Sequence, residues 1–155
     1  MVSPIDRIEY ESMLFGRYLA MLPAGRSRRR GGRLDPSAYT LLSLLDSGGP
    51  ASLAELGAVT GLDASTLNRQ TAALRRAGLA ERFEDPDGGQ ARKLWLSDEG
   101  RRLLTEEREA SQAVLADLLA DWPEQDRVQL GELLARYNRM IEERYGRHWP
   151  RPAGP

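Results

Sequence analysis

The stretch that decides the fold reads Gly61-Leu-Asp-Ala-Ser-Thr-Leu-Asn-Arg-Gln-Thr-Ala-Ala-Leu-Arg-Arg-Ala-Gly78. Asp63 can accept hydrogen bonds from the free amides at the start of a helix, and Gly78 can adopt the left-handed conformation that ends one. The spacing of the apolar positions predicts an inward stripe of Leu67, Thr71 and Leu74. The outward residues are small, polar or basic, which suits base edges and phosphates; they are Ser65, Thr66, Asn68, Arg69 and Ala72. A solvated helix face is the alternative for this helix alone, so the flanking sequence has to decide.

Two helices are expected before this stretch. Asp35-Pro36 has the sequence of a helix start, and the buried positions that follow are Leu41, Leu42, Leu44 and Leu45. Ser52 and Glu55 have the spacing of a capping box, in which each side chain satisfies the other residue's free amide. The short helix that they begin is expected to reach about Thr60, and residues 61–63 then turn the chain. Two short helices joined by a tight turn that contains glycine predict a helix-turn-helix.

The pattern after Gly78 changes to that of a β-hairpin. Residues 79–84 alternate, Asp85-Pro-Asp-Gly-Gly89 is a dense turn signal, and residues 93–96 make a second strand. A hairpin directly after a helix-turn-helix is the wing of a winged helix, whose tip commonly reaches toward the minor groove. Arg92 and Lys93 are the basic residues of this wing. A calcium loop is a poor alternative, because Leu96 stands where that loop needs a glutamate.

Long helices are predicted on both sides of the winged helix. Ser3-Pro4 begins one that runs to about residue 22, and Ser97 begins another that continues to about Asp121. Trp122-Pro123 separates it from a last helix that ends near Tyr145. These helices carry more apolar surface than a small winged helix can cover, so a partner subunit is expected on them. The chain is therefore read as one unit, 1–155, with a winged helix-turn-helix at 35–97 and a helical dimerisation region at 4–24 and 98–145. A palindromic operator has two half-sites, so it requires two DNA-binding domains, one from each subunit of a dimer.

Composition narrows the class of protein. The chain has 155 residues, 41% of them hydrophobic, and no cysteine, which excludes a disulfide scaffold and a thiolate metal site. No apolar run approaches the roughly 20 residues of a membrane helix, and the N-terminus is not a signal peptide, so the expected location is the cytoplasm. Because the net charge is −1, binding to DNA has to come from local basic patches. The strongest such patch includes Arg28, Arg29 and Arg30, which could grip phosphates; a solvated loop is the alternative.

Enzyme chemistry finds little support in the sequence. The single histidine, His148, lies in a tail rich in proline and arginine, where order is not expected. The adjacent pairs Glu106-Glu107 and Glu142-Glu143 diverge on their helices and are read as solvated surface. We therefore expect no catalytic residue, no metal site and no cofactor.

The chain resembles the MarR family of bacterial transcriptional regulators, in order and spacing, from about residue 34 to 104. The motifs that carry the resemblance are Leu34-Asp-Pro-Ser-Ala-Tyr39, Gly61-Leu-Asp-Ala-Ser-Thr-Leu-Asn-Arg69, Arg76-Ala-Gly-Leu79, Asp85-Pro-Asp87 and Leu96-Ser-Asp-Glu-Gly100. The resemblance implies a homodimer on a palindromic site in double-stranded DNA. It also implies that small, often phenolic or otherwise lipophilic molecules can bind between the two regions and weaken DNA binding. A repressor is expected. The alternatives are a winged helix used for protein interaction and a regulator without a ligand.

The resemblance also assigns roles to residues. Four are expected to enter the major groove: Ser65, Thr66, Asn68 and Arg69. Phosphate contacts are expected from Arg82, Arg92, Lys93 and the cluster with Arg28, Arg29 and Arg30. Many family members carry Asp and Arg at the wing tip, where this chain has Gly88, Gly89 and Gln90, so Arg92 is the candidate to replace the tip arginine. Gln70 stands where the family usually has an apolar residue and is expected to be partly exposed or hydrogen-bonded.

Overall fold

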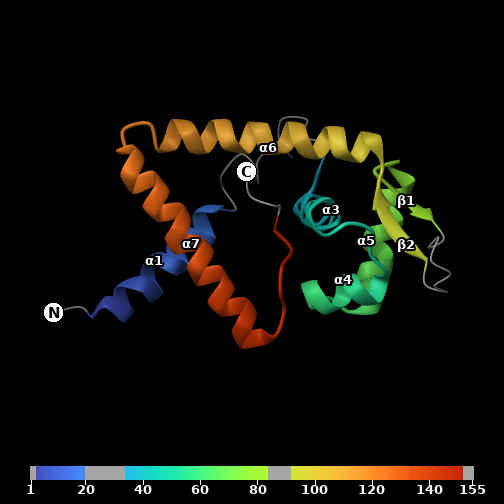
Figure 1. Ribbon diagram of the computed structural model, residues 1–155, viewed down its shortest axis with the longest axis horizontal. Coiled ribbons are helices and arrows are strands. Elements are labelled where there is room, and N and C mark those ends of the chain that lie inside the picture. Colours follow the sequence, from blue (N-terminus) through green and yellow to red (C-terminus); the bar gives the residue numbers. More distant parts are fainter. Residues whose placement is uncertain (1–2, 20–33, 84–91, 152–155) are drawn as a thin grey trace.

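The computed structural model describes residues 3–19, 34–83 and 92–151, and within them the fold is mainly α-helical with one small hairpin (Figure 1). The elements in chain order are α1 (Pro4–Leu19), α3 (Pro36–Gly48), α4 (Leu53–Thr60), α5 (Ala64–Arg76), β1 (Ala80–Phe83), β2 (Lys93–Leu96), α6 (Asp98–Leu118) and α7 (Glu124–Tyr145). This confirms the predicted fold class, a winged helix-turn-helix flanked by long helices. Residues 20–22 of the first predicted helix and the wing tip, with Gly88, Gly89 and Gln90, lie outside the described residues.

Leucines from the helices and from strand β2 form the core of the winged helix, and β1 contributes Ala80. The predicted stripe of α3 is buried, and so are Leu56 of α4 and Leu67 and Leu74 of α5. Leu94 and Leu96 of the wing and Leu103 and Leu104 of α6 complete the cluster. Burial of one such side chain stabilises the fold by roughly 1.5–3 kcal/mol. The first two turns of α6 therefore belong to the core of the winged helix.

Side-chain caps begin the helices where the sequence predicts. Asp35 accepts a hydrogen bond from the Ala38 amide at 2.9 Å. The capping box is complete, since Ser52 Oγ accepts from the Glu55 amide at 3.2 Å and Glu55 Oε2 from the Ser52 amide at 2.7 Å. At the C-terminal end of α5, which we call the reading helix because its residues are the ones predicted to contact base edges, Gly78 has a φ of 72°, the left-handed conformation that its position requires. Local hydrogen bonds thus set these helix boundaries.

The wing is an antiparallel pair of strands, β1 and β2, and the segment around Ala51 adds a short backbone pairing to β2. Ala80 lies opposite Leu96, and Phe83 opposite Lys93. Ala51, in the connection between α3 and α4, exchanges two backbone hydrogen bonds with Leu94, at 3.0 and 2.7 Å. The wing is therefore joined by backbone hydrogen bonds to the segment that leads into the helix-turn-helix.

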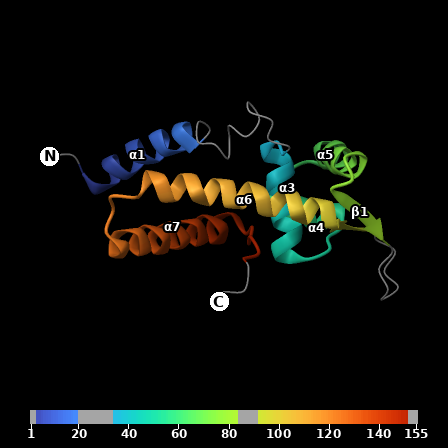
Figure 2. The ribbon, with the colours of Figure 1, turned by 90° about the horizontal axis from the view of Figure 1, so that it is seen from above.

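The remaining helices project away from the winged helix. Figure 1 shows α6 running outward from it and α7 returning at an angle, and Figure 2 places α6 between α1 and α7. The sequence predicted a helix to about Asp121, but α6 ends at Leu118, because the chain turns there with hydrogen bonds from Ala120 to Asp117 and from Trp122 to Leu119. In α1 and α7, which are described over their whole length, no residue is buried.

The C-terminal segment corrects two sequence-based expectations. Residues 146–151, which we call the C-terminal strap, follow α7 and are ordered against the winged helix, where Trp149 packs on the leucine core. Glu142 is not a solvated surface residue, because its side chain is only 14% exposed and pairs with Arg151. The sequence pattern misled here since a tail rich in proline and arginine carries no local signal of the tertiary contacts that order it.

Gly100 offers a direct test of the packing between α6 and the end of the reading helix. A Cβ atom added to Gly100 would lie 2.0 Å from the carbonyl oxygen of Leu79, a backbone atom. We expect Gly100→Ala to lower the free energy of unfolding by about 1–3 kcal/mol in chemical denaturation, because the backbone has to move apart. The matched control is Gly131→Ala in α7, where, apart from the adjoining residues and the backbone of the helix itself, no described atom lies within 4 Å of the added Cβ. There the helix gains about 0.5–1 kcal/mol. Equal stability of Gly100→Ala and the parent protein would contradict this packing.

Candidate nucleic-acid interface

Helix α5 presents most of the predicted base-contacting residues to solvent. Its inward stripe, Leu67, Thr71 and Leu74, is buried as predicted, which fixes the rotation of the helix on the core. Ser65, Asn68 and Arg69 are exposed on the other side. The helix therefore offers a hydroxyl, an amide and a guanidinium within its first two turns, the part of a reading helix that meets base edges.

Thr66 differs from the other three candidates. Its backbone amide donates to Asp63 Oδ1 and its hydroxyl to Asp63 Oδ2, both at 2.8 Å, and the residue is half-buried. The backbone amide first, and then the hydroxyl, hold the pKa of Asp63 below its ordinary value. Asp63 therefore stays ionised as the cap of α5, and Thr66 is engaged in that cap.

The candidate phosphate contacts lie on and beside the wing. Arg82 is exposed on β1, Arg92 is exposed immediately before β2, and Lys93 is half-buried at the first position of β2. Arg28, Arg29 and Arg30 lie outside the described residues.

Gln70 follows Arg69 directly and carries a polar atom that needs a partner. The residue is half-buried, and its Oε1 atom is buried with no hydrogen-bond partner among the described residues, as is Oγ of Ser43 in α3. An unpaired buried acceptor costs roughly 1–3 kcal/mol. The predicted partial exposure is thus correct for the residue, while its amide oxygen lacks a partner within the described part of the chain.

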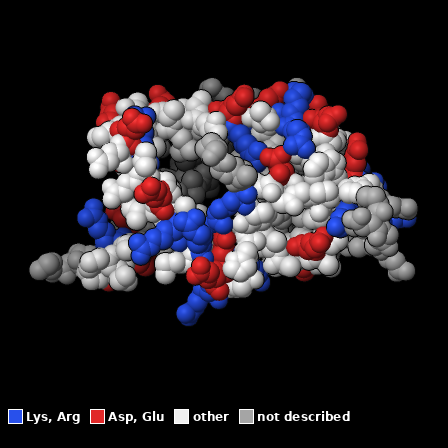
Figure 3. All heavy atoms as spheres, viewed as in Figure 1, with Lys and Arg blue, Asp and Glu red and all other residues white. Residues whose placement is uncertain are grey.

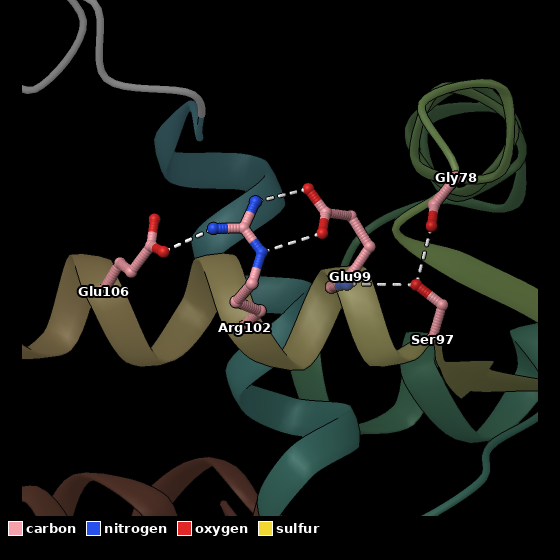
Figure 4. A network of polar contacts seen from close by, with 6 residues as sticks. Gly78, Ser97, Glu99, Arg102 and Glu106 are labelled. Carbon is pink, nitrogen blue, oxygen red and sulfur yellow. Dashed lines mark hydrogen bonds and ion pairs between the residues drawn. The ribbon is translucent and has the colours of Figure 1, made fainter.

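Ser97 connects the end of the reading helix to the start of α6. Its Oγ donates to the carbonyl of Gly78 at 2.6 Å and accepts from the Gly100 amide at 3.0 Å. Figure 4 shows both bonds beside the N-terminal turn of α6. The sequence predicted the cap but not the bond to Gly78, which lies 19 residues away. This bond holds the C-terminal end of α5 against α6.

An acidic side chain in α3 binds two arginines of α6. Asp46 accepts from Arg101 at 2.8 Å and from Arg108 at 2.6 Å. The Arg101 guanidinium also lies 5.7 Å from the ring centroid of Trp95 on the wing, within the range of a cation–π contact. Each of these surface pairs, of which Arg108–Asp46 is partly buried, contributes about 1 kcal/mol or less, but together they join α3, α6 and β2. Sequence reasoning missed this cluster because its members are 55 and 62 residues apart.

Arg102 is engaged within its own helix. It donates to the two carboxylate oxygens of Glu99 at 2.8 and 2.6 Å and also pairs with Glu106 (Figure 4). The hydrogen bond to Glu99, above all, raises the pKa of Arg102 beyond its ordinary value. This arginine is charged but neutralised locally, which makes it a poor candidate for a phosphate contact.

Charge on the molecular surface is mixed. The face in Figure 3 shows basic and acidic side chains next to one another, with basic side chains gathered in a group at the lower left and centre and another at the upper right, while the net charge of the chain is −1. Attraction to DNA therefore has to be local. Among the described residues, no group of three or more His, Asp or Glu side chains could hold a metal ion. Nor does any helix in that part of the chain have the length and apolar character to cross a membrane.

A cavity of about 350 Å³ lies between the winged helix and the C-terminal strap. Leu44, Leu56 and Val59 form apolar walls on one side, and Trp149 lines it from the strap. Glu55 and His148 supply its titratable groups. The volume is within the range of sites for small molecules.

A capped helix-turn-helix with an exposed polar reading helix, followed by a two-stranded wing, defines a winged helix-turn-helix protein. Comparison with known proteins gives the family. A model of the MarR family matches residues 34–91. The uncharacterized HTH-type transcriptional regulator YxaD of Bacillus subtilis is 37% identical over 139 residues, which cover 90% of this chain and 96% of the relative. The chain belongs to the MarR family of transcriptional regulators, which is not a class of enzymes.

Solved structures agree with this family. A MarR family protein from Bacillus stearothermophilus superposes with a TM-score of 0.72 at 24% identity, over 88% of this chain and 96% of that one. A probable transcriptional regulator from Pseudomonas aeruginosa gives a TM-score of 0.66 at 30% identity, over 87% and 99% of the two chains. The fold is therefore shared along nearly the whole length of these regulators.

Proposed function

We propose that this MarR-family regulator is a repressor that binds a palindromic operator in double-stranded DNA as a homodimer, and that it acts in the cytoplasm. The observation that carries the proposal is the exposed face of α5, where Ser65, Asn68 and Arg69 stand on a helix whose opposite side is buried. Arginine pairs with guanine and asparagine with adenine through two hydrogen bonds each. In this assignment Thr66 stabilises the start of the helix through its hydrogen bonds to Asp63, and it approaches DNA in that hydrogen-bonded conformation.

Selection from a random duplex library tests the DNA-binding proposal. The full-length protein is expected to enrich one sequence with two inverted half-sites, and footprinting upstream of its own gene should then protect a match to it. Expression from that promoter should rise when the gene is deleted. If no sequence is enriched, the winged helix serves another purpose, such as protein interaction.

The wing and its neighbours are assigned to the DNA backbone. Arg82 and Arg92 are exposed on the same hairpin, and Lys93 begins its second strand. Basic side chains beside a reading helix neutralise phosphates and strengthen binding without reading sequence. We assign Arg28, Arg29 and Arg30 to the same role on the grounds of sequence alone.

The homodimer is proposed from the apolar surface of the long helices. Large hydrophobic side chains of α1 are exposed, namely Ile5, Ile8, Tyr10, Met13, Phe15, Tyr18 and Leu19. So are those of α7, namely Val128, Leu133, Tyr137, Met140, Ile141 and Tyr145. Apolar surface on this scale is characteristic of a protein interface. A second copy of the chain would cover this apolar surface and would also supply the second winged helix that a palindromic site requires.

We propose that the cavity beside Trp149 receives a small, neutral aromatic effector that weakens operator binding. Its walls are mainly apolar, and the carboxylate of Glu55 disfavours an anionic ligand. With phenol as the probe at millimolar concentration, the indole N–H signal of Trp149 is expected to shift in NMR spectra, while that of Trp95 on β2, which does not line this cavity, stays in place. Benzoate, of similar size but anionic, is expected to move the Trp149 signal less. An unmoved Trp149 signal with phenol would rule this cavity out.

A further inference from the structure

The C-terminal strap, residues 146–151, contacts the winged helix of its own chain at more than one place. Gly146 has a φ of 64°, which ends α7 and lets the chain reverse direction. Figures 1 and 2 both show the strap passing from the end of α7 to the side of α4 and α3. Trp149 packs there against the leucine core.

Two glycines of the winged helix lie directly under the strap. A Cβ atom added to Gly48, at the end of α3, would lie 3.0 Å from Cγ of Pro150. A Cβ atom added to Gly61 would lie 1.9 Å from a guanidinium nitrogen of Arg147. Gly61 is the left-handed residue in the turn that leads into the reading helix. The strap thus touches both the end of α3 and the turn of the helix-turn-helix.

The other end of the strap is anchored to α7 by Glu142. The Glu142 carboxylate accepts from the Trp149 amide at 3.2 Å and from the Arg151 guanidinium at 3.0 and 2.5 Å. The hydrogen bond from Arg151, above all, holds the pKa of Glu142 below its ordinary value. A single carboxylate therefore fastens the strap to the helix from which it departs.

We propose that Trp149 and Glu142 are positioning residues for operator binding, because the strap fixes the orientation of the winged helix relative to α7. Each winged helix of the homodimer is one reading head. The proposal rests on the homodimer and DNA binding proposed above. Helix α6 is packed into the winged helix through Leu103 and Leu104, so the connection at which α7 could change its angle is the turn between α6 and α7, at residues 119–123. That turn alone would let α7 swing relative to the winged helix, whereas the turn together with the strap defines its orientation. In a homodimer, this orientation sets the distance between the two reading heads, and so the half-site spacing that the dimer accepts.

The distance between reading heads can be measured without DNA. The chain has no cysteine, so Arg75→Cys, at an exposed position in the last turn of α5, places one spin label on each reading head. Dipolar spectroscopy on the full-length homodimer is expected to give a narrow distribution of distances. Adding Trp149→Ala, or Glu142→Gln, which keeps the tryptophan, should broaden it. The matched control Glu143→Gln, at the next position of α7, should leave it narrow. A distribution that stays narrow with both Trp149→Ala and Glu142→Gln overturns the proposal.

Operator spacing supplies the second readout. The parent protein is expected to prefer one spacing between half-sites, and Trp149→Ala should lower affinity for that spacing about tenfold while changing affinity for a single half-site less than about twofold. A role in stability alone would weaken both equally, and that result would also contradict the proposal. Absence of a dipolar signal in the parent would instead refute the homodimer, and absence of selected DNA would refute operator binding, so the three failures are distinguishable.

The attachment of the strap to α7 should also depend on pH, because it uses the carboxylate of Glu142. Because the folded-state pKa of Glu142 is below its ordinary value of 4.5, the ionised carboxylate supports the strap above that pH. This support is lost as the pH falls through the lowered pKa. The distance distribution of the parent should therefore broaden in acid, whereas that of Glu142→Gln, already broad, should change little.

Discussion

If the proposed homodimer forms through α1, replacing Ile8 with aspartate is expected to convert the protein from a dimer to a monomer and to abolish tight operator binding. Ile8 lies on α1, where half of its surface is exposed in the single chain and several large apolar neighbours are exposed with it. An unpaired carboxylate in the proposed dimer interface would cost several kcal/mol of desolvation. Losing the second reading head removes the avidity of two linked half-site contacts, about 10²–10⁴-fold in affinity. Sedimentation equilibrium measures the first effect and operator titration the second.

The conservative variant Ile8→Met controls for the position itself. It keeps an apolar side chain of similar volume, so the dimer and operator binding should both be retained. If Ile8→Asp remains dimeric and binds the operator as the parent does, α1 lies outside the dimer interface, and the exposed side chains of α7 would have to form it.

Arg69→Ala is expected to have the second large effect, on sequence recognition. Arg69 is exposed in the second turn of α5, next to Asn68, on the face opposite the buried stripe. A forked contact from arginine to guanine is worth about 1–3 kcal/mol, so affinity for a single half-site should fall about 5- to 150-fold, and affinity for the two half-sites of the selected operator should fall further. Selection with the variant should lose its preference at one position in each half-site.

Arg75→Ala is the matched control on the same helix. Arg75 is also exposed but lies in the last turn of α5, away from the N-terminal part that meets base edges. It can contribute to phosphate binding, so affinity can fall in parallel for all sequences, with base preferences unchanged. An unchanged affinity and base preference in Arg69→Ala would show that another element reads the operator.

The helix-turn-helix could be predicted from residues that interact over three or four positions. The capping box of Ser52 and Glu55, the cap at Asp63 and the left-handed Gly78 all occur where their sequence signatures predict. The buried stripe of Leu67, Thr71 and Leu74 follows from the helical period in the same way. Such features depend on local backbone geometry, so the sequence alone is sufficient to place them. The exposed candidates Ser65, Asn68 and Arg69 follow from the same rotation of the helix.

Contacts between distant residues could not be predicted in this way. Asp46 meets Arg101 and Arg108, and Ser97 meets Gly78, only after the helices have packed, and no local pattern encodes those pairs. The orientation of the winged helix relative to α7 also depends on such contacts between distant residues.

The C-terminal strap shows the difference most clearly. Its proline and arginine content indicated a tail without order. In the structure, however, Trp149 packs against the leucine core and Arg151 forms an ion pair with Glu142. Caps, helical periods and the hairpin turn made the winged helix readable in the amino-acid sequence, because each is settled within a few residues of the chain. The path of the strap required the packed helices, because its partners come from α3, α4 and α7 and exist as a surface only in the folded chain.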